Sequence, residues 1–567
     1  MSGTANAQQV SAPAHGVVNV AARLGAMARE RPEAAAVVEP LGYGADGRRQ
    51  YRTITFRALD EDSDRVARGL IEMGVTPGTR LALLVRPGID FVSLVFALLK
   101  SGAVTILIDP GMGKRNLIRC LAEVEPEGFV AIPPVHAVRC LLRHRFPKAR
   151  HHLTVGRRWF WGGTTLAALR KTPHRGGELC QTRADDPAAI IFTTGSTGPP
   201  KGVLYRHETF DAQVRFIRDF YGIAPGEVDV AAFPLFGLFN AAMGVTAVIP
   251  EMDPTRPAKA DPAKIVEAIR DWQATQAFGS PAVWNRVGPY CREQGIRLET
   301  LRRVLSAGAP VPIGVLEGMM ACIHPEGDVH TPYGATEALP VASIGARTVL
   351  GETAARTRLG QGVCVGHRFG GIRWKVVRIV DGPLTALDQA EELPPGEIGE
   401  LIVSGPQVTR QYVNRHHANA LGKIAEGDEV WHRMGDAGYL DETDRFWFCG
   451  RVAHRLLTAV GPMYTIPCEA IFNSHPAVAR SALVGVGEPS RQHPVLVVEP
   501  ADRRLLTDAA FRESVFGELR EMAVAHPHTA SIEQFLVHPA FPVDIRHNVK
   551  IFREKLAVWA AGRVARR

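Results

Sequence analysis

Segments with helical spacing alternate with short apolar segments over residues 54–330. The stretch LDEDSDRVARGLIEMG (residues 59–74) has the spacing of an amphipathic helix, and RLALLV (residues 80–85) follows it as a strand. Another helix is expected at DPAKIVEAIRDWQAT (residues 261–275), which begins with an aspartate cap and a proline in its first turn. Alternation of this kind predicts an α/β fold with a largely parallel sheet.

The most apolar stretch of the chain, FVSLVFALLKSGAVTILI, covers residues 91–108. Lys100, Ser101 and Gly102 interrupt it, so neither part reaches the roughly 20 apolar residues that a membrane-spanning helix needs. A buried helix followed by a buried strand therefore explains the pattern better than a membrane span.

The chain has 567 residues, which is too many for one compact core, so about two to four domains are expected. From about residue 370 to 450, strand-like segments such as GEIGELIVSG follow one another without long helices, which predicts a β-rich subdomain. Beyond Arg451 the pattern is mixed again. We therefore divide the chain into a disordered leader (1–16), a large domain (17–451) and a small C-terminal domain (452–567).

Charge and cysteine usage argue against several classes of protein. The formal net charge is +8 without a lysine-rich block, so we interpret it as a mildly basic surface rather than a site for nucleic acid or a membrane surface. The eight cysteines include no CxxC pair, which argues against a zinc framework and a thioredoxin-like motif. The first residues lack the basic start and apolar core of a signal peptide, so we expect a cytoplasmic protein with reduced thiols.

A loop rich in hydroxyl groups and glycine follows the apolar residues 190–192. Its sequence, TTGSTGPPKG, combines hydroxyl donors with a backbone that can expose its amides, and Lys201 adds a positive charge. The Walker spacing is absent, and Pro199 and Pro200 carry no N–H, so hydroxyls and the earlier glycines would hold the anion. We predict a phosphate-binding loop here; a surface linker is the alternative.

This loop resembles the phosphate loop of the adenylate-forming superfamily, which contains acyl- and aryl-CoA synthetases, adenylation domains of peptide synthetases, and luciferases. Five further motifs of that superfamily follow in the same order: SAGAP (306–310), YGATE (333–337), MGDAGYLD (434–441), FCGR (448–451) and VKIFREKL (549–556). The resemblance implies the fold of these enzymes. That fold has a large α/β domain of parallel layers with a β-rich subdomain, followed by a small mobile α+β C-terminal domain.

The superfamily motifs also imply roles for individual residues. Lys550, Glu337 and Thr194 would be catalytic, and Glu337 would bind Mg²⁺, since a hard cation prefers a carboxylate oxygen. Asp436 and Arg451 would contact the ribose, and the aromatic residue of YGATE would stack on adenine. The expected cofactors are ATP and Mg²⁺. The expected ATP- and AMP-binding residues are Thr193, Thr194, Gly195, Ser196, Thr197, Gly198, Lys201, Gly308, Ala309, Pro310, Tyr333, Gly334, Ala335, Thr336, Asp436 and Arg451.

An acyl pocket is expected where FPLFGLFNAAMG (residues 233–244) meets FGSPA (residues 278–282). The resemblance implies that both segments line the acyl side of the site. Gly237 stands where many relatives carry a bulkier residue, which would leave room for a branched or long chain. Packing in the core is the alternative role for the phenylalanines. The expected pocket residues are Phe236, Gly237, Phe239, Gly279 and Ser280.

Longer stretches resemble one family within the superfamily, the β-lactone synthetases of bacterial long-chain olefin biosynthesis. These stretches are residues 253–265, 432–455, 525–529 and 541–560. The resemblance implies that a 2-alkyl-3-hydroxy fatty acid is adenylated with release of pyrophosphate, and that its β-hydroxyl then closes onto the carbonyl and expels AMP. Coenzyme A would not be needed. In agreement, Ala453 stands where coenzyme A ligases usually carry a hinge aspartate or lysine.

Alternatives remain open from the sequence. A long-chain fatty acyl-CoA ligase or an acyl-AMP ligase with an unusual hinge is one, and a non-catalytic nucleotide-binding scaffold is an alternative of another class. The general base for ring closure is open between His432, His454, His547 and a phosphate oxygen of the substrate. The resemblance also implies an assembly with other enzymes of the olefin pathway, whereas no nucleic acid and no transmembrane segment are expected.

Overall fold

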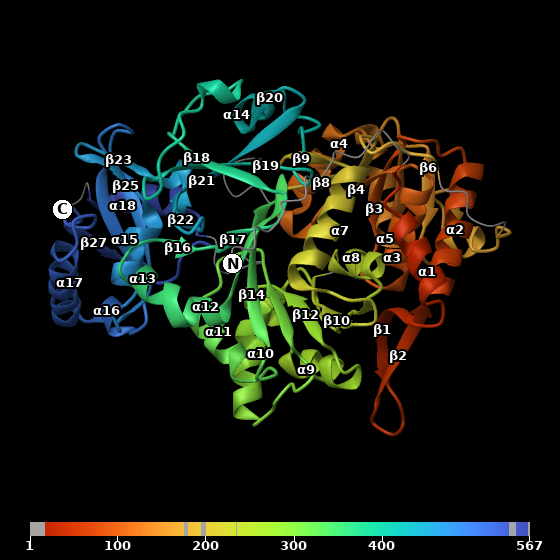
Figure 1. Cartoon of the computed structure of the whole chain (residues 1–567), viewed down its shortest axis with the longest axis horizontal. Coiled ribbons are helices and arrows are strands. Elements are labelled where there is room, and N and C mark those ends of the chain that lie inside the picture. The colour runs from red at the N-terminus through yellow and green to blue at the C-terminus, as the bar shows by residue number, and fades with distance from the viewer. Residues whose placement is uncertain (1–17, 175–179, 194–199, 234, 544–550, 565–567) are drawn as a thin grey trace, which may run out of the picture.

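The computed structural model describes residues 18–174, 180–193, 200–233, 235–543 and 551–564. Its strands form three large sheets, a three-stranded sheet and a two-stranded ribbon, and the chain passes along the long axis of the molecule from the first sheets to the last (Figure 1). None of the helices in these ranges combines the length and the apolar character needed to cross a membrane.

The first large sheet is almost entirely parallel. Its strand order is β7-β6-β5-β3-β4-β8-β9, and only the pair β8–β9 is antiparallel. Its strands are β3 (Arg80–Leu84), β4 (Val104–Leu107), β5 (Gly128–Ala131), β6 (His151–Thr154), β7 (Thr164–Thr165), β8 (Pro187–Phe192) and β9 (Gly202–Arg206).

The second large sheet has a parallel centre and antiparallel edges. Its order is β17-β15-β14-β13-β12-β10-β11-β1-β2, and the pairs from β14 to β1 are parallel. Its strands are β1 (Ala35–Tyr43), β2 (Arg49–Thr55), β10 (Val228–Ala231), β11 (Thr246–Val248), β12 (Gln276–Gly279), β13 (Arg303–Ser306), β14 (Asp328–Ala335), β15 (Ala338–Gly345) and β17 (His367–Arg368). The predicted α/β architecture is confirmed.

Helices connect the strands of both sheets. Three of them begin at side-chain caps: the Thr55 hydroxyl accepts the N–H of Ala58, the Thr165 hydroxyl accepts that of Ala168, and the Asp261 carboxylate accepts that of Ala263. The helices are α1 (Ala22–Glu30), α2 (Phe56–Glu72), α3 (Ile89–Lys100), α4 (Lys114–Glu123), α5 (Pro133–Leu141), α6 (Leu166–Leu169), α7 (His207–Tyr221), α8 (Phe236–Met243), α9 (Pro262–Asp271), α10 (Pro281–Glu293), α11 (Ile313–Met320), α12 (Ala346–Thr348) and α13 (Ala354–Arg358).

The long apolar stretch forms α3 and β4, as predicted. Every residue of α3 except Asp90 is buried, and β4 is buried throughout. Lys100 ends the helix in the interior, where its ammonium group pairs with the carboxylates of Asp60 and Asp64 on α2. The pairing explains how a lysine can lie inside a core helix, because an unpaired buried charge would be strongly destabilising.

The predicted β-rich region is a third sheet, and all of its strand pairs are antiparallel. Among the described residues, the 3₁₀ helix η5 (Leu387–Gln389) and the short helix α14 (His416–Gly422) interrupt it. Its strands are β16 (Val363–Cys364), β18 (Arg373–Val377), β19 (Gly399–Ser404), β20 (Lys423–Glu426), β21 (Glu429–Leu440) and β22 (Phe446–Arg451).

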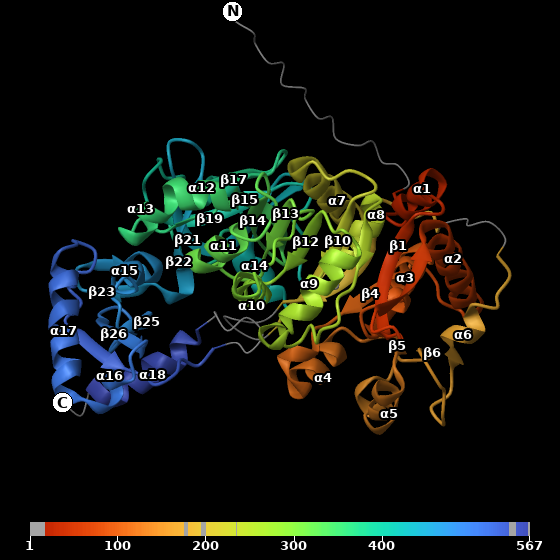
Figure 2. The same cartoon turned by 90° about the horizontal axis from the view of Figure 1, so that it is seen from below.

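The elements after Arg451 are mixed α and β and lie together at one end of the molecule, in blue in Figure 2. Two clusters of buried apolar side chains in this part contain only residues from Leu456 onward. We propose these elements as the small domain. They are β23 (Leu456–Thr458), β24 (Gly461–Met463), α15 (Thr465–Phe472), β25 (Val478–Val486), β26 (His493–Pro500), α16 (Arg504–Thr507), α17 (Ala509–Val524), β27 (Gln534–Val537) and α18 (Arg553–Val564).

Candidate active site

The hydroxyl-rich loop connects β8 to β9, and two hydrogen bonds close its neck. The N–H of Thr193 donates to the carbonyl of Lys201 over 3.0 Å, and the N–H of Lys201 donates to the Thr193 hydroxyl over 3.1 Å. Both ends of the loop are therefore fixed at the edge of the first sheet. The predicted residues Thr194, Gly195, Ser196, Thr197 and Gly198 lie outside the described residues.

Three of the predicted nucleotide-binding residues form one hydrogen-bonded chain. Asp436 of β21 pairs in register with Arg451 at the end of β22, and the Arg451 guanidinium donates to Asp436 Oδ1 over 2.7 Å. From β14, the Tyr333 hydroxyl donates to Asp436 Oδ2 over 2.5 Å. Asp436 is buried, so its carboxylate has a fixed orientation.

These three hydrogen-bonded residues can form further hydrogen bonds to a ligand. A carboxylate can accept about four hydrogen bonds, so Asp436 can take more than the two it receives from the protein. The Arg451 Nε–H is buried and has no hydrogen-bond partner among the described residues, which leaves a donor for a polar group. Burial, and then the Asp436 carboxylate, raise the pKa of Tyr333, so its hydroxyl stays a donor.

Glu337 is held at both its backbone and its side chain. The N–H and the hydroxyl of Thr409 donate to the Glu337 carbonyl over 2.9 and 3.0 Å. The Tyr412 hydroxyl donates to Glu337 Oε1 over 2.7 Å. The Lys201 ammonium lies 4.8 Å from the centre of the Tyr412 ring, so Tyr412 connects the predicted phosphate loop to the predicted metal ligand.

A second lysine stands in the same cluster. The Lys423 ammonium donates to the carbonyl of Thr409 and lies 5.8 Å from the Tyr412 ring centre. Burial lowers the pKa of Lys423 to about 7; the Glu337 carboxylate opposes this shift and Lys201 adds to it. The sequence motifs point to neither Tyr412 nor Lys423, because both come from the segment between β19 and β21, which only the fold brings beside β9.

The remaining nucleotide residues lie at the ends of two neighbouring parallel strands. Gly308, Ala309 and Pro310 follow β13, where Gly308 has a positive φ of 94°. Gly334, Ala335 and Thr336 stand at the end of β14, and the Tyr205 hydroxyl donates to the Thr336 carbonyl over 2.6 Å. Ligands of α/β sheets bind beyond the carboxyl ends of the strands, which is where these segments lie.

Two of the predicted acyl-pocket residues pack around Phe278 at the end of β12. The rings of Phe236 and Phe278 stack with centroids 3.8 Å apart, and Phe239 lies next to Phe236 at 5.8 Å. A Cβ added at Gly279 would lie only 2.8 Å from the Trp284 ring. The adjacent Ser280 hydroxyl is buried without a hydrogen-bond partner among the described residues, and it is therefore available to a polar group of a ligand.

Gly237 faces the core. A Cβ built on it would lie 3.7 to 3.8 Å from side-chain atoms of Ile249, Ala247 and Val92, all of which are buried. That is ordinary van der Waals contact, so the fold would accept alanine here. Whether Gly237 makes room for a branched acyl chain stays a prediction.

The predicted C-terminal motif lies partly outside the described residues, which include neither Lys550 nor His547. Its arginine, Arg553 at the start of α18, donates to the buried Glu469 carboxylate of α15 and to the carbonyl of Leu483. Burial raises the pKa of Glu469. The motif is thus anchored to the elements that follow Arg451.

The two described histidine candidates differ in their surroundings. His432 of β21 is buried, and its Nδ1 bonds the carbonyl of Gly422 over 2.9 Å. Burial lowers the pKa of His432 well below its ordinary value, so its ring is neutral at pH 7 and weakly basic. His454, in the turn η6 (Val452–His454), bonds Glu554 over 3.2 Å, and burial lowers its pKa as well.

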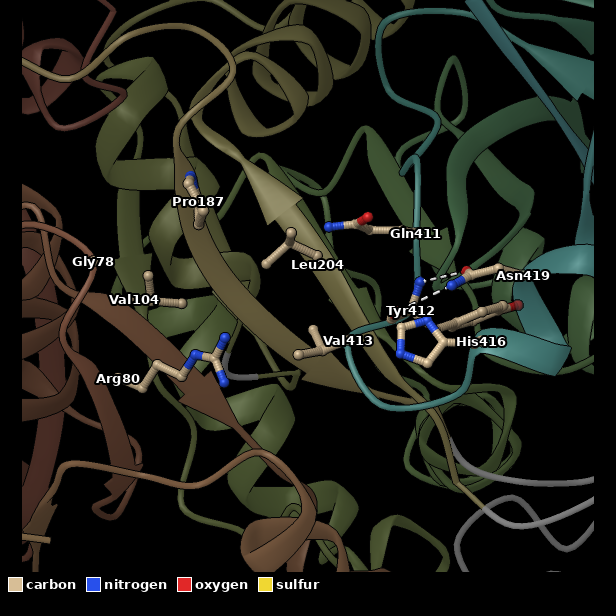
Figure 3. Close-up of a pocket in the computed structure, with 10 residues that line it drawn as sticks. All are labelled: Gly78, Arg80, Val104, Pro187, Leu204, Gln411, Tyr412, Val413, His416 and Asn419. Atoms are coloured by element: carbon tan, nitrogen blue, oxygen red, sulfur yellow. Dashed lines mark hydrogen bonds between the residues drawn. The ribbon is translucent and has the colours of Figure 1, made fainter. Parts of the chain in front are cut away.

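A separate cavity of about 330 Å³ lies beside β9 (Figure 3). None of the predicted site residues lines it. Tyr412 belongs to its wall, although the hydroxyl of that residue reaches Glu337. We assign this cavity no function. It is lined by Gly78, Arg80, Val104, Pro187, Leu204, Gln411, Tyr412, Val413, His416 and Asn419.

Glu337 is the one metal ligand that the sequence predicts. Among the described residues, no group of three or more His, Cys, Asp and Glu side chains could hold a metal. A site with Glu337 as its protein carboxylate fits Mg²⁺, which commonly binds through one or two carboxylates together with substrate phosphates and water.

Comparison with known proteins agrees with this geometry. The chain is 47% identical over 550 residues to the olefin beta-lactone synthetase of Xanthomonas campestris pv. campestris, which covers 96% of this chain and 97% of that protein. It is also 47% identical over 557 residues to the olefin beta-lactone synthetase of Stenotrophomonas maltophilia, with 97% and 99% covered.

Among solved structures, the fold matches an amide bond synthetase from Marinactinospora thermotolerans with a TM-score of 0.75 at 22% identity, over 95% of this chain and 99% of that one. It also matches o-succinylbenzoate coenzyme A synthetase from Bacillus subtilis, solved with ATP and magnesium, with a TM-score of 0.70 at 20% identity, over 94% and 98%. The family model described as AMP-binding enzyme matches residues 25–413. The chain therefore belongs to the AMP-binding family of adenylate-forming enzymes.

Proposed function

We propose that this protein is an ATP-dependent β-lactone synthetase that acts on a 2-alkyl-3-hydroxy fatty acid. The observation that carries the proposal is the 47% identity, over nearly the whole chain, to two olefin beta-lactone synthetases. The reaction converts the hydroxy acid and ATP into a β-lactone, AMP and pyrophosphate. By the same relationship, we propose that the protein works in the cytoplasm beside other enzymes of olefin biosynthesis.

In the first step a carboxylate oxygen of the acid attacks the α-phosphorus of ATP, and pyrophosphate leaves. Asp436 and Arg451 bind the ribose hydroxyls, supported by the free capacity of the Asp436 carboxylate and by the unpartnered Arg451 Nε–H. Lys201 and the loop after Thr193 hold the phosphates. Lys550 neutralises the negative charge that carboxylate and phosphate share as they approach.

Glu337 is the protein ligand that we propose for Mg²⁺, which would neutralise phosphate charge when bound. The Tyr412 hydroxyl bonds Oε1 and orients the carboxylate. Lys201 and Lys423 beside this cluster add positive charge toward the phosphates, and Lys423 adds it mainly below about pH 7.

In the second step the β-hydroxyl attacks the acyl carbonyl, the carbonyl–phosphate bond breaks and AMP leaves. The nucleophile is already attached to the electrophile, and such tethering lowers the barrier by roughly 7–11 kcal/mol for well-oriented groups. His432 is a poor candidate for the base because burial keeps its pKa low. His454, His547 and a phosphate oxygen of the adenylate remain as acceptors of the hydroxyl proton.

The test is product identification. The protein is incubated with ATP, Mg²⁺ and a racemic 2-alkyl-3-hydroxy acid, with and without coenzyme A, and the products are identified by NMR and mass spectrometry. We expect a β-lactone in equal yield in both reactions. A thioester that forms only with coenzyme A, without lactone, would show an acyl-CoA ligase instead.

Variants separate a catalyst from a nucleotide-binding scaffold. Lys550→Ala should lower the rate of adenylation by orders of magnitude, whereas Lys148→Ala, which removes a surface lysine paired with Glu125, should leave it unchanged. An undiminished adenylation rate in Lys550→Ala would refute the role proposed for this lysine.

A further inference from the structure

One region of the chain carries an unusual excess of positive charge. Between Glu127 and Glu178 the sequence contains no aspartate or glutamate. The net charge of +8 is therefore unevenly distributed, which the total alone does not reveal. The cations of this stretch are Arg139, Arg143, Arg145, Lys148, Arg150, Arg157, Arg158, Arg170, Lys171 and Arg175.

The same region exposes large apolar side chains. Trp159 and Phe160, in the loop between β6 and β7, are 63% and 76% exposed. Leu141 and Val138 are 82% and 51% exposed, and their spacing of three residues places them on one face of α5. An exposed group of this size and kind is unusual for a surface that meets only water.

Buried contacts join the loop to α5, so the exposed rings are held in place. The Trp161 ring stacks on His136 of α5, with centroids 5.9 Å apart and an interplanar angle of 15°. Its Nε1–H donates to the Thr154 hydroxyl over 3.0 Å, and its carbonyl accepts a hydrogen bond from Arg139 over 3.1 Å. The Trp159 ring stacks on that of Trp161, with centroids 5.9 Å apart. In Figure 2, α5 and β6 project together from the lower edge of the molecule.

Several arginines of this surface are free to meet an anion. Arg143, Arg145, Arg157 and Arg158 are exposed, and none forms an ion pair with a carboxylate of the described residues. Within the described ranges, Arg158 donates only to the carbonyl of Gly163. Their guanidinium groups suit phosphate, which they can bind in a bidentate manner.

We propose that this aromatic–arginine surface, formed by α5, the turn η2 (Arg143–Arg145) that follows it and the loop 155–163, docks the protein on membranes that contain anionic phospholipids. Tryptophan and phenylalanine insert at the boundary between head groups and acyl chains, while arginines bind the lipid phosphates. Single-stranded nucleic acid would also attract cations and aromatic rings, but the aliphatic Val138 and Leu141 offer no face for a base to stack on. The surface shares no residue with the proposed active site, so its failure would leave the proposed function untouched.

The test is flotation of the full-length protein with vesicles of phosphatidylcholine alone or mixed with phosphatidylglycerol. We expect binding to the mixed vesicles only, weakened by added salt. Trp159→Ser/Phe160→Ser should weaken it by at least about tenfold, because two buried rings are lost. Arg157→Gln/Arg158→Gln should weaken it about 25-fold, since each cation near an anionic surface contributes about fivefold.

Matched surface variants serve as controls. Leu41→Ser removes an exposed leucine of the β1–β2 hairpin, and Arg286→Gln removes an exposed arginine of α10. Both should bind vesicles like the unaltered protein, and all variants should keep the rate of ATP–pyrophosphate exchange.

Three outcomes would overturn the proposal. One is the absence of binding to mixed vesicles, and another is equal binding of the surface variants and the controls. The third is that the unaltered protein binds no vesicles but binds an acidic partner protein, and that the surface variants lose this binding. That result would identify a protein interface instead.

Discussion

Tyr412 connects the two halves of the candidate phosphate site, since its hydroxyl bonds Glu337 while its ring faces Lys201. A hydrogen bond to a charged group contributes about 1.5–3 kcal/mol. We therefore expect Tyr412→Phe to slow ATP–pyrophosphate exchange about tenfold or more and to raise the Mg²⁺ concentration needed for half-maximal rate. Tyr43→Phe, which removes a surface hydroxyl bonded to Glu267, is the control. An unchanged Mg²⁺ dependence in Tyr412→Phe would contradict this orienting role.

Lys423 should affect how the free energy of unfolding depends on pH. Burial lowers its pKa from 10.5 to about 7 in the folded protein. Between pH 7 and about 10 the unfolded chain holds a proton on this lysine that the folded protein has lost, so this residue makes stability rise with pH. In Lys423→Met that contribution disappears. The difference in unfolding free energy between Lys423→Met and the unaltered protein should therefore change across this range, and a constant difference would contradict the shifted pKa.

Single residues also show where prediction from the sequence stops. Asp436 and Arg451 belong to motifs whose order is recognisable, and they come together because they lie on the neighbouring strands β21 and β22. Tyr412 and Lys423 belong to no such motif. They lie near Glu337 because the fold brings the segment between β19 and β21 beside β9, which is far away in the sequence. The interaction of Tyr333 with Asp436 is not visible in the motifs either, because a stacking role says nothing about the hydroxyl.

At the scale of elements, the start of the MGDAGYL segment of β21 sets the position of Asp436 and Arg451, the pair proposed to bind the ribose. Gly435 has a φ of 64°, and a Cβ there would lie 3.3 Å from Nη2 of Arg451. Gly435→Ala should cost about 1–2 kcal/mol of stability through the left-handed backbone and should also weaken ATP binding. Gly427→Ala, in the turn before β21, has the same backbone strain at φ 56° but no neighbour within 4 Å. Calorimetric titration with ATP should show weaker binding in the first variant only.

Elements with strong local signals are the ones that the sequence predicts best. The capped helix α9 and the interrupted pair α3 and β4 appear as expected, because caps, a first-turn proline and a broken apolar run act locally. Strand order follows from long-range packing, and so the placement of β1 beside β11 could not be read from either segment. The burial of Lys100 depends likewise on two carboxylates of another helix.

For the whole molecule, nucleotide binding should stabilise the fold. A ligand present at 100 times its dissociation constant adds about 2.7 kcal/mol to the stability of a protein that binds it only when folded. We expect ATP to raise the melting temperature, and Asp436→Asn to lose most of this shift because an amide cannot accept hydrogen bonds at both of its positions. Asp388→Asn, an exposed carboxylate, is the control. A full shift in Asp436→Asn would argue against the proposed ribose contact.

The central claim is that the carboxylate is activated and that the β-hydroxyl attacks it. The most direct test uses a hydroxy acid labelled with ¹⁸O in both carboxylate oxygens, with mass spectrometry of the AMP and the lactone. The proposed reaction places one labelled oxygen in AMP and the other in the lactone carbonyl, while the unlabelled hydroxyl oxygen enters the ring. Unlabelled AMP together with a lactone that keeps both labelled oxygens would show that the hydroxyl is activated instead, and would contradict the mechanism.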